Sequence, residues 1–253
     1  MKMHLLSGGR LRLRTSVYFP DADRSETMEL PVSCALFRHP QGNVLFDTGC
    51  HPAVPDDPQA RWGRLAEIMV PIMPKGDNVV TGLADIGLQC EDIDVVVCSH
   101  LHPDHCGCNT LFKRADFIIH KNEIEAARGP GAKNAGYLAG EWEQSAPTEE
   151  LDGERDLFGD GRIVLIPLPG HTPGTTGALV ALDRCGKFLL ASDAVSVRAT
   201  LDRDIIPRNT WNADALEKSL VEIRHIQRHG ATVLCGHDDE QWQSLRKGAD
   251  AYD

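Results

Sequence analysis

Residues 99–109 (SHLHPDHCGCN) bring together three histidines, one aspartate and two cysteines in one short run. In an extended segment alternate residues share a face, so His100 and His102 are predicted to project together. As the chain turns into a helix, Asp104 and His105 would reach a second point. Two metal ions suit this spacing better than one, and the run therefore predicts a metal centre.

Three later segments share one feature: each begins as a short apolar strand and ends in a possible ligand. They are IPLPGHTPG, LLASDAV and VLCGHDDE. Ligands at strand ends are held firmly by the sheet and can converge at one edge. Five imidazoles and two carboxylates result, a set that suits zinc and also iron, manganese or cobalt. The candidate ligands are His100, His102, Asp104, His105, His171, Asp193 and His237.

Two further pairs of residues carry weaker signals. Cys106 and Cys108 lie beside the histidines, where they could bind metal or cycle through a disulfide. Because nitrogen and oxygen ligands already fill two sites, we interpret both as small buried residues. His225 and His229 lie four residues apart in a predicted helix, without the glutamate of an H-E-x-x-H motif. We therefore place them at the negative end of that helix.

The elements that must position the ligands are mainly strands. Two-residue alternation and β-branched or aromatic residues predict early strands at 10–19, 32–39 and 43–49, arranged as a meander. Residues 93–98 are nearly all apolar, which is typical of a strand buried on both faces. An amphipathic helix is predicted over 212–230, ending at a glycine. Further short strands are predicted at 115–120, 161–168, 176–183, 187–193 and 231–237.

Two segments have less regular patterns. Residues 61–78 concentrate leucine, isoleucine and methionine between prolines. This composition is compatible with a helix and turn packed on the sheet, or with an apolar wall for an acyl chain or a dimer arm. Residues 139–156 are acidic and are predicted as a solvated insertion between strands. Trp142 within them is a candidate for the mouth of the site.

Composition narrows the classes of function. The 253 residues are 42% hydrophobic and 25% charged, with no repeat or linker, so one domain over 1–253 is expected. A net charge of −11 disfavours nucleic acid as a partner. The first apolar stretch is too short for a signal peptide or a membrane span. With eight scattered cysteines expected to be reduced, these features predict a cytoplasmic protein with no membrane partner.

The motifs HLHPDH, GHTPGTTGAL, SDAV and GHDDEQ, preceded by LFDTG, resemble the metallo-β-lactamase superfamily. Their order and spacing are most similar to those of the N-acyl homoserine lactonases, and the resemblance covers residues 32–241. It implies an α/β fold, an αβ/βα sandwich of two mixed β-sheets flanked by helices (the metallo-β-lactamase fold). It also implies a dinuclear metal site at one edge of that sandwich.

Carried over by position, the resemblance divides the candidate ligands between two ions. The first ion would be held by His100, His102 and His171, and the second by Asp104, His105 and His237. Asp193 would bridge the two ions. Asp47 in LFDTG would be a carboxylate that orients the ligand loop and fixes the tautomer of an imidazole.

The resemblance further implies a zinc-dependent hydrolase that opens the lactone ring of N-acyl homoserine lactones, a quorum-quenching activity. Two divalent ions, Zn²⁺ or else Fe, Mn or Co, would lower the pKa of a bridging water, and the resulting hydroxide would attack the carbonyl. Asp104 is predicted as a proton shuttle and Asp193 as the second catalytic residue. Alternatives are hydrolysis of another small lactone, ester or phosphotriester, or a metal-binding sensor. A small-molecule substrate and a monomer or homodimer are expected.

One position departs from the lactonase pattern. Similar lactonases commonly carry a tyrosine three residues after the bridging aspartate, where its hydroxyl can support the developing oxyanion. This sequence has Ser196 there, whose hydroxyl is shorter and a weaker donor. Either another group takes over, or the substrate differs. Tyr18 and Tyr137 are the aromatic hydroxyls that could substitute, and the sequence pattern places neither.

Overall fold

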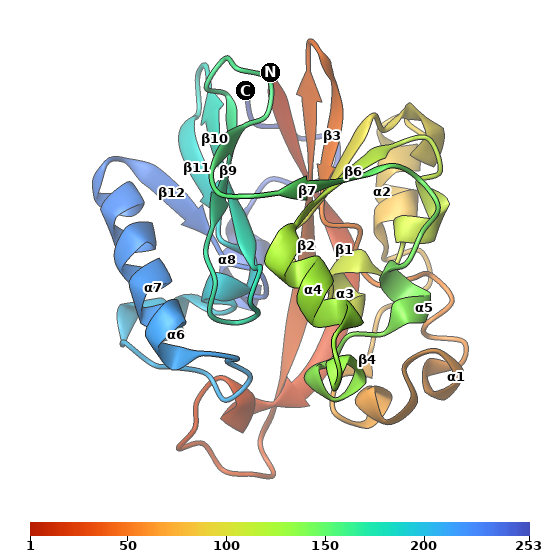
Figure 1. Ribbon diagram of the computed structural model, residues 1–253, viewed down its shortest axis with the longest axis vertical. Coiled ribbons are helices and arrows are strands. Elements are labelled where there is room, and N and C mark those ends of the chain that lie inside the picture. Colours follow the sequence, from red (N-terminus) through yellow and green to blue (C-terminus); the bar gives the residue numbers. More distant parts are fainter.

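The computed structural model describes residues 1–253 and contains two β-sheets packed face to face, with helices on the outer side of each (Figure 1). The first sheet has seven strands in the order β4-β1-β2-β3-β5-β6-β7, and the second has five in the order β12-β11-β10-β9-β8. Both sheets mix parallel and antiparallel pairs. The predicted αβ/βα sandwich is therefore the fold of this chain.

The elements have the following bounds. The strands of the first sheet are β1 (Lys2–Arg14), β2 (Thr27–His39), β3 (Gly42–Phe46), β4 (Val70–Pro71), β5 (Val95–Cys98), β6 (Asp116–His120) and β7 (Thr148–Leu151). Those of the second are β8 (Arg155–Asp156), β9 (Ile163–Pro167), β10 (Thr176–Leu182), β11 (Gly186–Leu190) and β12 (Ala231–Leu234). The helices are α1 (Pro58–Trp62), α2 (Val79–Asp85), α3 (Pro103–Cys106), α4 (Lys121–Arg128), α5 (Ala139–Trp142), α6 (Arg198–Asp202), α7 (Ala213–Arg228) and α8 (Asp239–Ser244).

Strand direction decides where the site can form. The predicted meander is confirmed, because β1, β2 and β3 pair antiparallel in sequence order. From β3 onward the pairs β3–β5, β5–β6 and β6–β7 are parallel. In the second sheet, β11 and β12 are also parallel. Residues that follow β3, β5, β11 and β12 therefore come out at strand carboxyl ends, where side chains from separate segments can meet.

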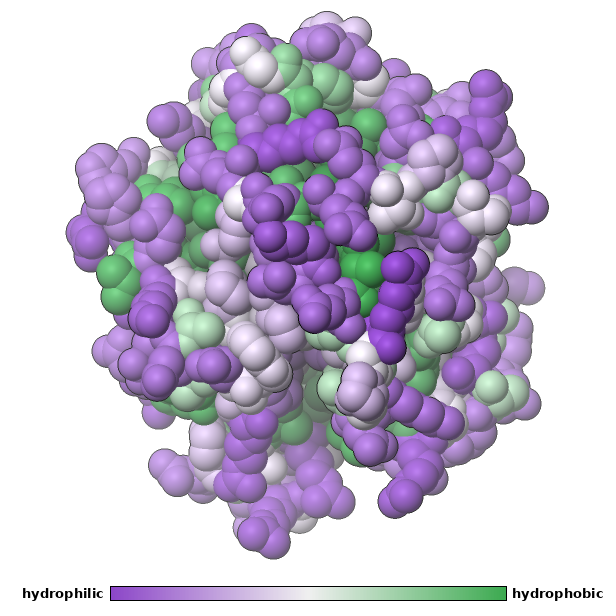
Figure 2. Space-filling model, viewed as in Figure 1, coloured by the Kyte–Doolittle hydropathy of each residue, from purple (hydrophilic) through white to green (hydrophobic).

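The core consists of four apolar clusters: one between the sheets, one under each set of helices, and one where β1 and β2 pack against α1. β5 contributes to two of them, since Val97 lies in the layer between the sheets while Val96 and Cys98 face the layer under α2 and α4. The prediction that this strand is buried on both faces is confirmed. Figure 2 shows that the face in view is mostly hydrophilic, with hydrophobic residues in smaller patches. No helix is both long and apolar enough to cross a membrane.

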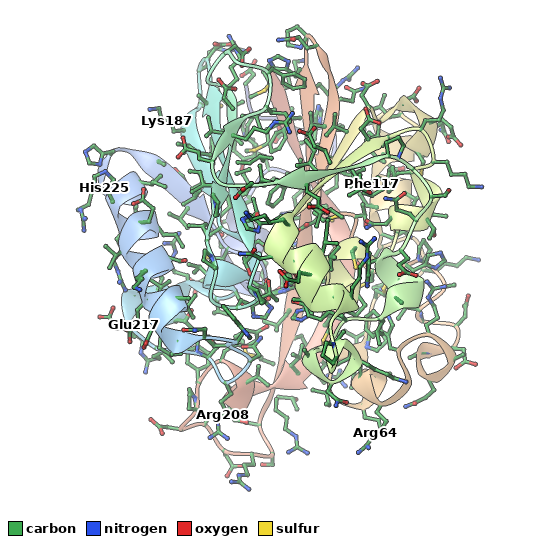
Figure 3. All side chains as sticks on the ribbon, in the orientation of Figure 1. Arg64, Phe117, Lys187, Arg208, Glu217 and His225 are labelled. Carbon is green, nitrogen blue, oxygen red and sulfur yellow. The ribbon has the colours of Figure 1, made fainter.

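The predicted amphipathic helix is α7, which covers the second sheet. Its buried residues recur at three- and four-residue steps, and the Asn212 side chain accepts a hydrogen bond from the amide of Ala215. Its last turn carries His225, which lies on the outer side of the molecule (Figure 3). The Nδ1 atom of His229 bonds the carbonyl oxygen of His225 at 2.8 Å, so this pair belongs to the helix end as predicted.

Three expectations about local structure need correction. The first strand starts at Lys2 and ends at Arg14, and a 3₁₀ turn over Thr15–Val17 replaces the expected strand end. Residues 139–156 are largely exposed, as predicted, but they are part of the sandwich rather than an insertion, because α5, β7 and β8 fall within them. Trp142 is buried in the core under the helices and does not line the pocket described below. The acidic composition of residues 139–156 is typical of a solvated loop and gives no sign of these short elements.

Candidate metal centre

All seven candidate ligands lie at one edge of the sandwich. They form three overlapping groups whose donor atoms lie within 4.8 Å of one another. The groups are His100–His102–His171, His100–His105–Asp193 and Asp104–His105–His237. The segments that carry these ligands come from both sheets. The cluster therefore forms only when the two sheets pack together.

The segment after β5 supplies four of these side chains. β5 ends at Cys98, and His102 is the N-cap residue of α3, with Pro103 at the first helical position. Proline there suits the start of a helix because its missing N–H would have no helical partner. The sharp turn into α3 separates His100 and His102 from the two ligands in the first turn, Asp104 and His105. The chain direction therefore changes between the two halves of the motif, as the sequence predicts.

The other three ligands follow strands of the second sheet. His171 lies in the connection from β9 to β10, Asp193 lies in a 3₁₀ turn after β11, and His237 follows β12. The amide of Thr176 donates to the carbonyl oxygen of Ser99 at 2.8 Å, which joins the two sheets beside the site. Each ligand is thus attached to a strand end, and the two sheets share the cluster.

Asp193 lies between two sets of imidazoles. Its Oδ1 atom is 3.1 Å from Nε2 of His237 and 3.4 Å from Nε2 of His105. Its Oδ2 atom is 3.5 Å from Nε2 of His171. One oxygen therefore faces each group, which is the placement that a bridging carboxylate requires.

Hydrogen bonds outside the cluster determine which ring nitrogen of each histidine points inward. Nδ1 of His105 bonds Oδ2 of Asp47 at 2.8 Å, and Nδ1 of His237 bonds the carbonyl oxygen of Pro31 at 2.8 Å. These partners only accept, so both Nδ1 atoms must donate, and in the neutral rings both Nε2 atoms carry lone pairs. The two Nε2 atoms nevertheless lie 3.2 Å apart. A positive charge between them would explain this contact.

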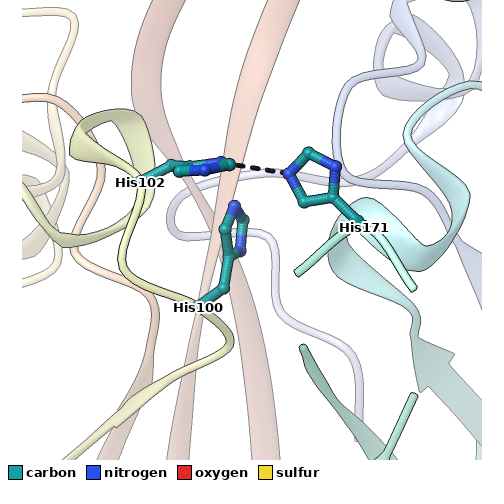
Figure 4. Close-up of side chains that lie close together, drawn as sticks. All are labelled: His100, His102 and His171. Carbon is teal, nitrogen blue, oxygen red and sulfur yellow. Dashed lines mark hydrogen bonds between the residues drawn. The ribbon is translucent and has the colours of Figure 1, made fainter. Parts of the chain in front are cut away.

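His102 is oriented in the same way, but through its other ring nitrogen. Nε2 of His102 donates to the carbonyl oxygen of Ala135 at 3.0 Å, which leaves Nδ1 as an acceptor. That Nδ1 lies 3.0 Å from Nε2 of His171 (Figure 4). Nε2 of His100 is buried and has no hydrogen-bond partner. Figure 4 shows the three rings converging, two from the loop after β5 and one from the loop between β9 and β10.

Asp47 organises the first of these loops. It is 1% exposed, and its Oδ1 atom accepts the amide of Ser99 at 2.7 Å. Its Oδ2 atom accepts the hydroxyl of Ser99 at 2.7 Å as well as Nδ1 of His105. The hydroxyl of Ser192 in turn donates to Ser99 at 2.7 Å. This network fixes a ligand through the atom that does not face the centre, the arrangement usual around protein-bound metals.

Charge at the centre favours a cation. Burial lowers the pKa of His105, but the carboxylates of Asp104, Asp193 and Asp47 outweigh burial and raise it well above its ordinary value. Burial raises the pKa of Asp193, but His237, His105 and His171 outweigh burial and pull it well below its ordinary value. The ion pairs of these three carboxylates are all with histidine. Inward lone pairs and buried negative charge therefore fit divalent metal ions.

A pocket of about 660 Å³ opens beside the cluster. Five of the candidate ligands line it, namely His102, Asp104, His171, Asp193 and His237. Apolar residues also line the pocket, among them Leu65, Ile68 and Met69. The apolar-wall interpretation of residues 61–78 is thus favoured, although α1 and a 3₁₀ turn also occur in this region. The pocket therefore has apolar side chains and the polar candidate ligands in one wall, as is usual for sites that bind small molecules.

The structure places the two tyrosines that the sequence left open. Tyr18 lines the pocket together with Asp104 and Asp193, and its side chain is nearly fully buried. Burial first, and then these two carboxylates, raise the pKa of the Tyr18 phenol, whereas the Ser196 side chain lowers it. Ser196 is buried and is not part of the pocket wall. Of these two hydroxyl-bearing residues, Tyr18 therefore lines the pocket and Ser196 does not. No spacing in the sequence predicts that Tyr18 lies beside the candidate ligands.

Tyr137, Cys106 and Cys108 lie next to the candidate ligands but are not among them. Tyr137 lines the pocket, its ring centroid 5.4 Å from that of His102, and its hydroxyl is buried. Cys106 and Cys108 are buried free thiols, and their Sγ atoms bond the carbonyl oxygens of His102 and Cys50. Burial raises the pKa of both thiols. Their prediction as small buried residues is confirmed.

Comparison with known proteins agrees with this geometry. The family model described as the metallo-beta-lactamase superfamily matches residues 27–237. The N-acyl homoserine lactonase AttM of Azorhizobium caulinodans is 30% identical over 270 residues, covering 100% of this chain and 99% of the relative.

Two solved structures have the same fold. An N-acyl homoserine lactone hydrolase with the product N-hexanoyl-L-homoserine bound at its catalytic metal center has a TM-score of 0.89 and is 23% identical, covering 99% of this chain and 98% of that one. AidC, a dizinc quorum-quenching lactonase, has a TM-score of 0.69 and is 14% identical, with coverage of 94% and 87%.

Proposed function

Because this chain belongs to the metallo-β-lactamase superfamily, we propose that it is a dinuclear metallohydrolase that opens the ring of N-acyl homoserine lactones. The observation that carries this proposal is the set of inward imidazole lone pairs around the two oxygens of Asp193, beside an apolar pocket. The full-length similarity to a lactonase selects the substrate class. Zn²⁺ is the proposed metal, with Fe, Mn or Co as alternatives, because imidazole and carboxylate donors suit all four.

The seven candidate ligands would hold the two ions in the grouping that the geometry provides, with Asp193 between them. When bound, two such ions lower the pKa of a water molecule and polarise the lactone carbonyl. The tautomers of His105, His237 and His102 are set beforehand by Asp47, Pro31 and Ala135, so these three donors need no rearrangement.

The pocket walls would orient the substrate. An acyl chain would lie along Leu65, Ile68 and Met69, which directs the polar ring toward the ligand cluster. Asp104 lines this pocket, so its carboxylate would take the proton that the attacking water loses and pass it to the ring oxygen as the ester C–O bond breaks. Tyr18 would donate its hydroxyl to the carbonyl oxygen as negative charge develops there.

Purified protein is expected to hydrolyse N-acyl homoserine lactones, with activity lost on chelation and restored by Zn²⁺ or Co²⁺. The assay compares homoserine lactones of graded chain length with γ-butyrolactone and a phosphotriester. Because apolar residues line part of the pocket, kcat/KM is expected to rise with chain length, by about 4-fold for each added CH₂ that becomes buried.

Controls must separate a different substrate from an absent activity. Preferential hydrolysis of the phosphotriester, or of lactones without an acyl chain, would contradict the substrate class. Protein with a full complement of metal that hydrolyses none of these compounds would instead be the metal-binding sensor considered above.

Tyr18→Phe is expected to lower kcat for homoserine lactones by about 10-fold, less than is typical for loss of a well-placed oxyanion donor. The phenol faces the pocket next to Asp104 and Asp193, and phenylalanine keeps its buried ring. Steady-state kinetics at matched metal content provide the measurement. Ser196→Ala is the paired variant and should lower kcat less than Tyr18→Phe, because Ser196 does not line the pocket and acts only through its contact with the Tyr18 phenol.

If Ser196→Ala lost most of its kcat while Tyr18→Phe kept a normal kcat, Ser196 and not Tyr18 would be the donor to the carbonyl oxygen. The substitution Ser196→Tyr is not expected to restore a donor, since position 196 is only 2% exposed and lacks room for a phenol.

A further inference from the structure

Glu123 is a buried carboxylate that the candidate ligand set does not include. It lies in the first turn of α4, and its exposed fraction is 0%. Burying an ionised carboxylate is costly unless hydrogen bonds compensate. Both of its oxygens accept backbone amides: Oε1 bonds the amide of Leu101 at 2.9 Å, and Oε2 bonds the amide of Gly174 at 3.0 Å.

These two amides belong to different ligand loops. Leu101 lies between the ligands His100 and His102, and Gly174 lies three residues after His171. The two loops come from the first and second sheets, respectively. One carboxylate therefore links the two segments whose rings meet in Figure 4.

The contact between Glu123 and the second loop depends on glycine. A Cβ atom at Gly174 would lie 2.5 Å from both Cβ and the amide nitrogen of Glu123, closer than any side chain allows. Glycine thus lets α4 approach the loop directly. Burial raises the pKa of Glu123, and the hydrogen bonds from Leu101, Thr172 and Gly174 oppose that rise.

We propose that Glu123 is a positioning residue of the metal centre, holding the loops of His102 and His171 at the separation that one metal ion requires. Each carboxylate oxygen of Glu123 holds one of the two loops, and in this arrangement Nδ1 of His102 lies 3.0 Å from Nε2 of His171. The inference rests on the proposed function, because it assumes that these rings bind metal. It assigns the role to a residue remote in sequence from every ligand motif.

The deciding variant is Glu123→Gln, which keeps the side-chain shape. Its amide oxygen can accept one backbone N–H, but its NH₂ group would face the second N–H, so one loop is released. Titration of metal-free protein with Co²⁺, followed by absorption and by chelator competition, reports the two sites separately. We expect one site to bind Co²⁺ about 10-fold more weakly with an altered spectrum, and the other site to stay near wild type.

Glu141→Gln is the matched control. Glu141 is also buried, at 2% exposure, but it bonds the guanidinium of Arg61 rather than a ligand loop. It should lower the melting temperature of the metal-free protein without changing the Co²⁺ spectrum. Equal Co²⁺ affinities in wild type and Glu123→Gln, or equal losses in both variants, would overturn the proposal.

A second variant covers the case in which Glu123→Gln does not fold. Gly174→Ala keeps the carboxylate but pushes α4 away from the loop, so the same Co²⁺ site should weaken. Unchanged Co²⁺ binding in Gly174→Ala would then reject the proposal. Wild-type protein that binds no Co²⁺ would reject the proposed function itself, so the two failures are distinguishable.

Discussion

Asp193→Asn is expected to bind about one metal ion per chain where wild type binds about two, and to lose kcat on the order of 1,000-fold. The two Asp193 oxygens face opposite imidazole groups, with Oδ1 3.1 Å from His237 and Oδ2 3.5 Å from His171. Asparagine keeps the shape but presents an NH₂ group to one side, where hydrogens would point at a lone pair. It also removes the negative charge that allows two cations to lie close together.

Elemental analysis of protein purified without chelator measures the stoichiometry, and lactone kinetics measure the activity. Asp183→Asn is a suitable control, since that carboxylate is exposed and pairs with Arg162 far from the pocket. The control should retain both metal and turnover. If Asp193→Asn kept two ions per chain and near-normal turnover, Asp193 could not be the bridging ligand.

The structure brings together the candidate ligands that the sequence predicted, and each of them has a local signal in the sequence. The H-x-H-x-D-H run fixes four side chains by spacing alone, and each of the other three follows a recognisable apolar strand. Strand ends converge in mixed sheets, so the meeting of the segments was also predictable. Residues 93–98 and α7 were predicted for the same reason, since burial on both faces and helical periodicity are local patterns.

The supporting contacts were not predictable in this way. Glu123 is one glutamate in an ordinary helix, and only the fold brings it to the amides of Leu101 and Gly174. The carbonyl oxygens of Pro31 and Ala135, which orient two histidines, carry no side-chain signal at all. Similarly, Tyr18 reaches the pocket because the first strand ends early in a 3₁₀ turn.

The turn that carries Tyr18 is itself held from the far end of the chain. The amide of Arg208 donates to the carbonyl oxygen of Val17 at 2.7 Å, and its guanidinium donates to that of Pro20 at 2.6 Å. The loop before α7 therefore fixes a residue of the N-terminal segment. Sequence periodicity describes elements one at a time, so a contact of this kind becomes visible only in the folded chain.

Asp47→Asn is expected to weaken metal binding at the Asp104–His105–His237 group by about 100-fold while leaving the backbone unchanged. Asp47 has a φ of 60°, a left-handed conformation that asparagine also tolerates. Its carboxylate accepts three hydrogen bonds, two from Ser99 and one from Nδ1 of His105. Asparagine has one acceptor oxygen and must turn its NH₂ group toward one of these donors.

If the new NH₂ group faces His105, that ring must accept through Nδ1 and carry its proton on Nε2, the atom that points at the metal. The ligand is then lost through its tautomer rather than through its position. Competition with a chelator should show the weakened site, and excess Zn²⁺ should restore much of the activity, since every ligand side chain is still present. Asp94→Asn, which alters an exposed carboxylate bonded to the amide of Asn43, should leave metal affinity unchanged. Normal affinity in Asp47→Asn would show that the His105 tautomer is set by the metal and not by Asp47.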